Sequence, residues 1–319
     1  MSLGPGHREA RRVQRRAQLR RRRLMALAAA VVVVGAGVGV AVAVSGGSRS
    51  PGGSSVAGAP ERGARADTGS RGVSTASVAP RTGAPATSDA NIKKLIALGL
   101  PIYCAGPNGN AVAFTFDDGP GPYTHYAVKK LTEAGERGTF FVVGRSMDNY
   151  PGWLPRELKV AAIGDHTTTH PELTALSSDE VRSQLATTKQ KIEADSGQPV
   201  ELWRPPYGAR SPTIDQIGQR LGMLEIMWST DSADSLGAEW DGIIRNVEAG
   251  LRPGAIILMH ENRGQTIRAL TTLLPELHRR HLRSVSLPEL FAADPPSVAQ
   301  VRQGLNGCSG GAKAHGAGG

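Results

Sequence analysis

The sequence contains only two cysteines among its 319 residues, Cys104 and Cys308. They lie far apart, whereas the cysteines and histidines of structural zinc sites recur at short spacings. Neither cysteine has the charged neighbours that activate a nucleophilic thiol. The cysteine content therefore argues against a cysteine-based metal site and against a cysteine nucleophile.

The region that can fold lacks excess positive charge, although the whole chain carries +9 at pH 7. Residues 1–23 carry +8 and residues 45–90 carry +2, whereas residues 91–319 carry −1. Binding of nucleic acid requires a basic face on a folded domain. The charge distribution therefore argues against a nucleic-acid partner.

The basic tail, residues 1–23, precedes the segment Leu24–Val44, which has 21 residues without charge. A helix of this length can span a bilayer, and the arginines before it should stay in the cytoplasm. We favour an uncleaved transmembrane anchor, while a signal peptide cleaved after Ala43 is the alternative. The arginine pairs also leave twin-arginine export open. Each alternative exports the rest of the chain, either anchored to the membrane or secreted.

Residues 45–90 lack large apolar side chains and are rich in Ser, Gly, Ala, Pro and Arg. Such a segment cannot bury a core, and we expect a disordered linker with a reach of roughly 40 Å. A folded domain is expected at 91–300 and a flexible tail at 301–319. In an exported protein, a cysteine pair favours a disulfide, here Cys104–Cys308 between the ends of the domain. Two unpaired buried thiols are the alternative.

From about residue 91 onward, short apolar runs alternate with amphipathic stretches. The clearest helix begins at Ser177, which forms a capping box with Glu180, and it ends at Gly197. The alternation predicts an α/β fold with a parallel sheet, whose functional sites lie beyond the C-terminal ends of the strands. Strands are expected at 111–116, 138–144, 224–230, 255–260 and 283–287, and further helices are expected from residues 126, 214 and 266.

Two adjacent carboxylates, Asp117 and Asp118, follow the first expected strand in the segment TFDDGP. Neighbouring strand residues point to opposite faces, so both can face one site only if the strand has ended, as the following Gly-Pro indicates. A plain turn would explain the same string. Asp231 and His260 also lie at or after strand ends, which favours a functional site.

The segment DHTTTH contains His166 and His170 at a spacing that predicts two imidazoles on one side of a helical turn. Two histidines and one carboxylate are a frequent catalytic zinc set. In WRPPYG, two prolines and a glycine restrict the loop around Arg204, whose guanidinium stays charged. Surface histidines and a rigid connector would explain each segment taken alone.

The motifs TFDDGP, HTTTH, RPPYG, DSAD and LMH occur in this order between about Cys104 and Leu290. Together they resemble the polysaccharide deacetylases, also called the NodB-homology or carbohydrate esterase family 4 domain. The resemblance implies a distorted (β/α) barrel and a metal-dependent hydrolase of acetylated polysaccharide. It also implies a divalent metal, usually zinc with cobalt as an alternative, held by Asp118, His166 and His170.

The same resemblance implies a role for each remaining motif residue. Asp117 would be the general base, and Arg204 would hold it in place. His260 would be the general acid, with Asp234 as its carboxylate partner. Substrate contacts are expected from the backbone N–H of Tyr207, from Pro206 and from Leu258 in the acetyl pocket.

Ser235 departs from the family pattern, because a tryptophan is common at this position, and so does Thr168, where an aromatic residue often stands. That tryptophan usually forms part of the sugar-side wall, so the substrate groove is expected to be more open or rebuilt. Trp240 could compensate for the loss, or it could pack in the core.

The leading hypothesis for the substrate is N-acetylglucosamine or N-acetylmuramic acid of peptidoglycan, acted on by a monomer. An anchor and a linker favour a glycan close to the membrane. Alternatives within the same fold are an O-acetyl esterase acting on xylan and a chitin oligosaccharide deacetylase. An alternative from another class is a non-catalytic module that binds wall glycan, which the intact ligands, base and acid argue against.

Overall fold

The computed structural model describes residues 87–308. The expected basic tail, the membrane segment Leu24–Val44 and most of the linker lie outside the described residues, as do residues 309–319. Within the described range, no helix has the length and apolar character needed to cross a membrane.

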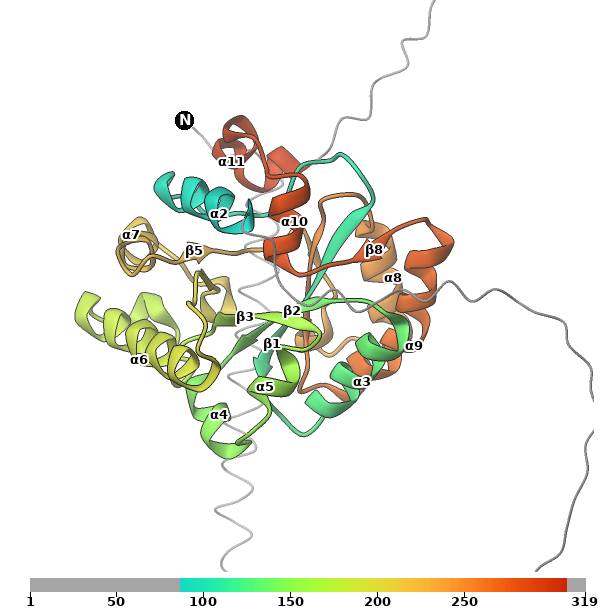
Figure 1. Cartoon of the computed structure of the whole chain (residues 1–319), viewed down its shortest axis with the longest axis horizontal. Coiled ribbons are helices and arrows are strands. Elements are labelled where there is room, and N and C mark those ends of the chain that lie inside the picture. The colour runs from blue at the N-terminus through green and yellow to red at the C-terminus, as the bar shows by residue number, and fades with distance from the viewer. Residues whose placement is uncertain (1–86, 309–319) are drawn as a thin grey trace, which may run out of the picture. The chain divides into compact units, whose positions relative to one another are not determined.

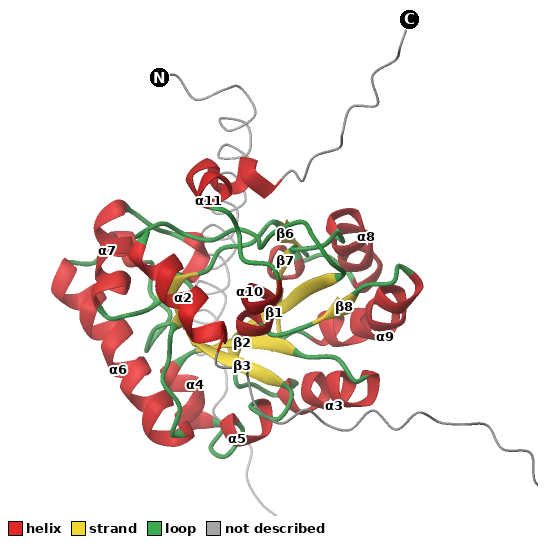
Figure 2. Ribbon diagram, turned by 45° about the horizontal axis from the view of Figure 1, so that its top comes forward, coloured by secondary structure: helices red, strands yellow, loops and turns green. Residues whose placement is uncertain are grey.

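A parallel sheet forms the centre of the domain, with helices packed around it (Figures 1 and 2). Its strands follow the order β5-β4-β3-β2-β1-β7-β6, and β8 pairs with the first part of β1. The two ends of this path, β5 and β6, do not pair with each other in the described residues, so the barrel is incomplete. The strands are β1 Ala111–Gly119, β2 Gly138–Val142, β3 Ala161–Asp165, β4 Leu202–Trp203, β5 Leu224–Glu225, β6 Thr230–Asp231, β7 Ile256–His260 and β8 Arg283–Ser284.

Several helices begin or end at capping residues. Ser177 and Glu180 form the expected capping box of α6, and the left-handed Gly197 ends that helix. Gly135 ends α3 in the same conformation. The helices are α2 Thr87–Ala97, α3 Thr124–Ala134, α4 Gly144–Asn149, α5 Leu154–Glu157, α6 Ser178–Ser196, α7 Pro212–Arg220, α8 Trp240–Gly250, α9 Gly264–Arg279, α10 Leu287–Ala293 and α11 Val298–Gln303.

Strand β1 is buried on both faces, and its alternating side chains divide between two apolar clusters. Phe114 and Phe116 pack in the cluster that also contains residues of helices α3, α6 and α9. Ala113 belongs to the other cluster, together with residues of α2 and α10. Because side chains alternate along a strand, Thr115 and Asp117 share the face of Ala113. This inner face leads directly to the C-terminal end of the sheet.

Three expectations about boundaries are wrong. The apolar run 224–230 is not one strand, because it forms β5 and β6, which are separated by four residues that belong to neither strand. Residues 301–308 are not a flexible tail, because α11 and the 3₁₀ helix Gly304–Cys308 continue the ordered structure. At the other end, helix α2 starts at Thr87, inside the expected linker.

The cysteines expected to pair do form a disulfide, Cys104–Cys308. The bond connects residues separated by 204 positions in the sequence. The guanidinium of Arg252 donates a 3.1 Å hydrogen bond to the carbonyl oxygen of Cys308 and also holds this end of the chain. The covalent link therefore explains why the C-terminal residues remain ordered as far as Cys308.

We predict that the double variant Cys104→Ser/Cys308→Ser loses roughly 2–5 kcal/mol of unfolding free energy, because the unfolded chain gains the entropy of an open loop. Denaturant titration of the full chain would measure the loss. The wild-type protein under reducing conditions should match the double variant. Equal unfolding midpoints for the oxidised wild type and the variant would contradict the prediction.

Candidate active site

Strand β1 does not end before its two carboxylates, contrary to the expectation from the sequence. It continues to Gly119, and its pairing with β2 shifts register between Asp117 and Gly119. Asp118 occupies this irregularity with a left-handed backbone, φ 73°. Such a bulge turns a side chain that regular alternation would send to the opposite face. Both carboxylates therefore reach one site without an end to the strand.

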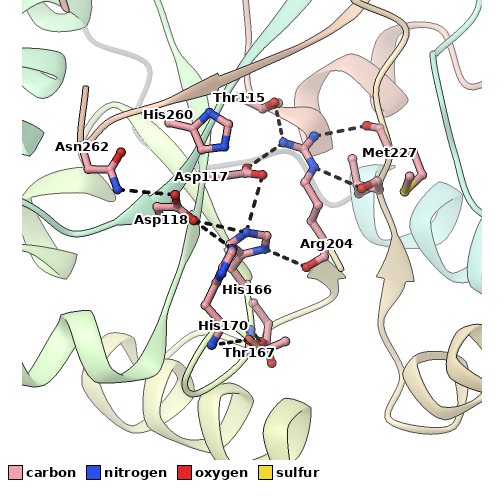
Figure 3. A network of polar contacts seen from close by, with 12 residues as sticks. Thr115, Asp117, Asp118, His166, Thr167, His170, Arg204, Met227, His260 and Asn262 are labelled. Carbon is pink, nitrogen blue, oxygen red and sulfur yellow. Dashed lines mark hydrogen bonds and ion pairs between the residues drawn. The ribbon is translucent and has the colours of Figure 1, made fainter. Parts of the chain in front are cut away.

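Arg204 is fully buried, and its guanidinium donates hydrogen bonds to four acceptors (Figure 3). Its Nη1 donates to Asp117 Oδ1 at 2.7 Å and to Thr115 Oγ1 at 2.8 Å. Nε and Nη2 donate to the carbonyl oxygens of Ile226 and Met227 at 3.1 and 3.2 Å. Burial lowers the pKa of Arg204 and the Asp117 charge opposes that change. The guanidinium thus holds the carboxylate of Asp117 in a fixed orientation.

His166 and His170 do not lie on a helical turn, and that expectation is wrong. They lie in the loop after β3, where Thr167 and His170 adopt left-handed backbone angles. Asp165 stabilises this turn by accepting the Thr167 N–H at 2.7 Å. The conformation of this loop brings the two imidazoles together, with ring centroids 4.9 Å apart.

The ring of His166 is fixed by the backbone of the neighbouring motif. Its Nδ1 lies 2.8 Å from the carbonyl oxygen of Arg204. A carbonyl oxygen can only accept, so Nδ1 carries the proton and Nε2 presents a lone pair toward the carboxylates. Burial lowers the pKa of His166 to about 4, more than the charge of Asp117 raises it. The imidazole is therefore neutral, as a metal ligand must be.

Asp118, His166 and His170 form a group whose ligand atoms lie within 4.8 Å of one another. Asp118 Oδ1 is 3.1 Å from His170 Nε2 and 3.6 Å from His166 Nε2. This oxygen is buried and has no hydrogen-bond partner among the described residues. Burial would raise the pKa of Asp118, but its contact with His170 opposes this, and the pKa lies well below its usual range. An anionic oxygen and two imidazole nitrogens around one point fit a divalent metal.

His260 ends strand β7 directly beside Asp117, with which it is in register on β1. Its Nδ1 lies 2.7 Å from Asp234 Oδ1, and its backbone N–H donates to Asp234 Oδ2 at 2.7 Å. Thr266 donates a further hydrogen bond to Oδ2. Burial would lower the pKa of His260, but the hydrogen bond and charge of Asp234 raise it to about 9. This imidazole is therefore protonated at neutral pH.

The expected substrate contacts lie on the same edge of the sheet. Leu258 precedes His260 by two residues on β7 and is opposite Thr115 in β1 and Asp231 in β6. Pro206 is buried, whereas Tyr207 is 62% exposed and has a left-handed backbone, φ 61°. The ring of Tyr207 stands edge-on to His170 with centroids 4.7 Å apart.

The position of the missing tryptophan remains open to solvent, because Ser235 is only partly buried and the next residue, Leu236, is 59% exposed. Trp240 does not replace that side chain. It starts helix α8, packs against the core and carries the guanidinium of Arg268 over its ring at 4.2 Å.

Sequence reasoning missed three supporting residues. Thr115 could have been found, because it precedes Asp117 by two positions and thus shares its strand face. Asn262 donates to Asp118 Oδ2 at 3.4 Å from the loop after β7, and Thr266 reaches Asp234 from helix α9. No local pattern marks the last two, because only the packing of distant elements brings them to the site.

Comparison with known proteins agrees with this geometry. Residues 105–226 match the family model for polysaccharide deacetylase. The chain is 32% identical over 194 residues to a peptidoglycan-N-acetylglucosamine deacetylase of Bacillus cereus, covering 59% of this chain and 70% of that protein. It is 32% identical over 197 residues to a chitooligosaccharide deacetylase of a Bradyrhizobium species, covering 56% of this chain and 90% of that protein.

A solved structure with a similar fold is that of a CE4 family pseudoenzyme from Bacillus anthracis. It is 32% identical, with a TM-score of 0.55 over 60% of this chain and 68% of that chain. The fold of this chain is thus shared with a relative. The site of this chain lies at the C-terminal edge of the sheet, where parallel α/β folds bind ligands. With the matching motifs and the extent of the likeness to the curated relatives, the chain belongs to the polysaccharide deacetylase family, CE4.

Proposed function

We propose that this protein hydrolyses N-acetyl groups of peptidoglycan, on N-acetylglucosamine or N-acetylmuramic acid. The observation that carries the proposal is the register of β1 with β7. It sets the arginine-bound carboxylate of Asp117 beside the protonated imidazole of His260. A base and an acid beside three side chains that can bind a metal are the groups that amide hydrolysis needs. The peptidoglycan deacetylase named among the relatives supports this glycan.

Asp118, His166 and His170 would hold the metal, and zinc suits this set of one oxygen and two nitrogen ligands, with cobalt as an alternative. A bound divalent cation supplies Lewis acidity, which acidifies water and polarises a carbonyl group. Asn262 would restrict the remaining oxygen of Asp118 by its hydrogen bond.

Asp117 would accept the proton of the attacking water. Arg204 occupies Oδ1 of this carboxylate, whereas Oδ2 faces His166 at 3.7 Å. The base therefore presents one oxygen to the site while the other is held by the guanidinium. Its neighbour Asp118 is engaged by imidazoles instead, so the two adjacent carboxylates take different roles.

His260 would donate a proton to the leaving nitrogen of the amide. The hydrogen bond between Asp234 and Nδ1 leaves Nε2 as the donor toward the site. The backbone N–H of Tyr207 is proposed to stabilise the developing oxyanion, and Leu258 and Pro206 to line the acetyl pocket.

Two alternatives remain within the same chemistry. Chitin oligosaccharides are favoured by the Bradyrhizobium relative, and an O-acetyl esterase acting on xylan would use the same groups. A non-catalytic module that binds wall glycan is an alternative from another class, and one of the related structures is named as a pseudoenzyme. This chain has a complete set of potential metal ligands together with Asp117 and His260, which argues for catalysis.

We further propose that Leu24–Val44 anchors the chain, with residues 1–23 in the cytoplasm and residues 45–86 as a flexible tether. The arginine cluster and the uncharged run of the sequence support this orientation. A secreted form cleaved near Ala43 is the alternative. The disulfide is consistent with an oxidising, extracellular location.

We expect Asp118→Asn and His170→Ala to lose affinity for zinc by at least about tenfold, because the first replaces an anionic ligand by a neutral amide and the second removes a ligand. Asp117→Asn should bind zinc nearly as well as the wild type. Isothermal titration of the metal-free protein would measure all three. Equal losses in Asp117→Asn and Asp118→Asn would contradict the division between the two carboxylates.

Turnover should respond in a complementary way. We expect Asp117→Asn to lose about 10²–10⁴-fold in kcat while it keeps its metal, because general-base catalysis contributes this much. Acetate release from peptidoglycan, chitin oligosaccharides and acetylated xylan would be measured on the zinc-loaded protein. Tight binding of one glycan without acetate release from any of them would favour the binding module.

The pKa of His260 should depend on Asp234. A pKa raised above the ordinary 6.5 means that protonated His260 stabilises the fold below pH 6.5, and that this stabilisation is lost as pH rises through about 9. In Asp234→Asn the burial of the ring is no longer opposed by a charge, so we expect the pKa to fall by at least about 2 units. NMR titration of the His260 ring signals would measure it. An unchanged titration would exclude Asp234 as the source of the shift.

A further inference from the structure

A second group of buried charges lies outside the site, where the RPPYG loop ends. Arg210 Nε donates to Glu225 Oε1 at 2.8 Å, and Arg210 Nη2 contacts the carboxylate of Asp215. The arginine comes from the loop, Asp215 from helix α7 and Glu225 from strand β5. The side chains of Glu225 and Asp215 are 4% and 7% exposed, so two buried carboxyl groups share one guanidinium.

These carboxyl groups have an unsatisfied oxygen each. Asp215 Oδ1 and Glu225 Oε2 are buried and accept no hydrogen bond from the described residues. Burial and the charge of Asp215 raise the pKa of Glu225 to about 8, and Asp215 lies close enough to form a side-chain hydrogen bond with it. A single proton between the two carboxyl groups would satisfy both oxygens and balance the charge of Arg210.

The loop that ends at Arg210 is attached to one neighbouring segment at both of its ends. At its start, Trp203 pairs with Glu225, and the next residue, Arg204, donates to the carbonyl oxygens of Ile226 and Met227. At its end, Arg210 binds the side chain of the same Glu225. Glu225 is therefore the point where both ends of the loop meet.

Between these attachments the backbone is strained. Tyr207 is a non-glycine residue with φ 61°, and Gly208 follows with φ 63°. A Cβ at Gly208 would lie 2.9 Å from the ring of Trp228, so the loop also packs closely on the segment after β5. Left-handed non-glycine residues persist only where the surrounding structure holds them.

We propose that Arg210, Asp215 and Glu225 are positioning residues that hold the Arg204–Arg210 loop in its strained form, and that they do so while the carboxyl pair keeps one proton. The expected effect on kcat rests on the proposed deacetylase function, whereas the expected effect on the conformation of the loop does not. Four titratable groups face one another here: Tyr103, from the segment before β1, and Arg210, Asp215 and Glu225.

Loss of the shared proton changes the charge balance. With one proton, a single carboxylate faces the Arg210 guanidinium, whose pKa the two carboxyl groups raise. Without it, two buried carboxylates compete for one arginine, which is costly in a poorly solvated place. The contacts among Arg210, Asp215 and Glu225, which we call the clamp, should therefore weaken at alkaline pH. The strained turn at Tyr207 and Gly208 should loosen with them.

Glu225→Gln tests the proton requirement, because glutamine is neutral at every pH and can both accept from Arg210 and donate to Asp215. A raised carboxyl pKa means that the wild-type fold loses stability as pH rises from the ordinary carboxyl range through about 8. The Tm of Glu225→Gln minus that of the wild type should therefore increase from pH 6 to pH 9. Asp215→Asn serves the same purpose if Glu225→Gln folds poorly.

Hydrogen exchange followed by mass spectrometry reports on the loop itself in the full chain. After correction for intrinsic rates, protection of residues 204–210 in the wild type should fall by up to about tenfold between pH 7 and pH 9, the limit for one proton released on opening over the pH unit below the raised pKa of Glu225. In Glu225→Gln the protection should stay constant. Identical pH dependence of both proteins in protection and in Tm would overturn the proposal.

Arg210→Lys tests the clamp, and Arg137→Lys is a matched control. Arg137 also binds a glutamate, Glu289, through Nε at 3.1 Å and is 30% exposed, against 27% for Arg210. Arg210→Lys should lower loop protection and reduce kcat by about 10- to 100-fold with little change in KM, since misplacement of a catalytic loop acts on turnover. Arg137→Lys should leave both readouts unchanged.

The experiments distinguish failure of the deacetylase function from failure of the clamp. If no glycan is hydrolysed but the loop protection responds as described, the deacetylase function is wrong and the clamp is retained. If acetate is released and Arg210→Lys behaves like Arg137→Lys in both readouts, the clamp is wrong and the deacetylase function is retained.

Discussion

The buried ion pair of Arg204 and Asp117 is the interaction on which the site depends. A guanidinium without solvent is tolerated only when its donors are satisfied, and here they bind Asp117, Thr115 and two carbonyl oxygens after β5. The backbone of Arg204 contributes as well, because its carbonyl oxygen fixes His166 and its N–H binds the carbonyl of Asp165. One residue thus connects β1, β3 and β5 and orients both Asp117, the proposed base, and His166, a proposed metal ligand.

Three carboxylates of the site differ because their partners differ. Asp117 is held by a guanidinium, Asp118 by two imidazoles and Asp234 by a third imidazole, the backbone N–H of His260 and a threonine hydroxyl. All lie in a mostly buried region. The pKa values of the two histidines differ for different reasons, because burial lowers that of His166 to about 4, whereas burial of His260 is outweighed by the hydrogen bond and charge of Asp234, which raise its pKa to about 9.

Sequence reasoning failed where the local pattern competed with tertiary constraints. His166 and His170 have helical spacing, but the bonds of Asp165 and Arg204 hold them in a loop. The run 224–230 has the apolar character of a strand, but the carbonyls of Ile226 and Met227 are used by Arg204 instead of by a neighbouring strand. Residues 301–308 are rich in polar residues and glycine, yet the disulfide keeps them ordered.

The sequence by itself determined the class of the fold, the order of the motifs and the residues that gather at the site. Alternating apolar runs and capped amphipathic stretches are local signals, and Gly-Pro and Arg-Pro-Pro mark the ends of strands. Only the tertiary structure decided how Asp117 and Asp118 face one site, through a bulge in a strand that continues. It also decided which partners set each pKa, because Thr266 reaches Asp234 and Glu225 reaches Arg210 by the packing of elements that are distant in the sequence.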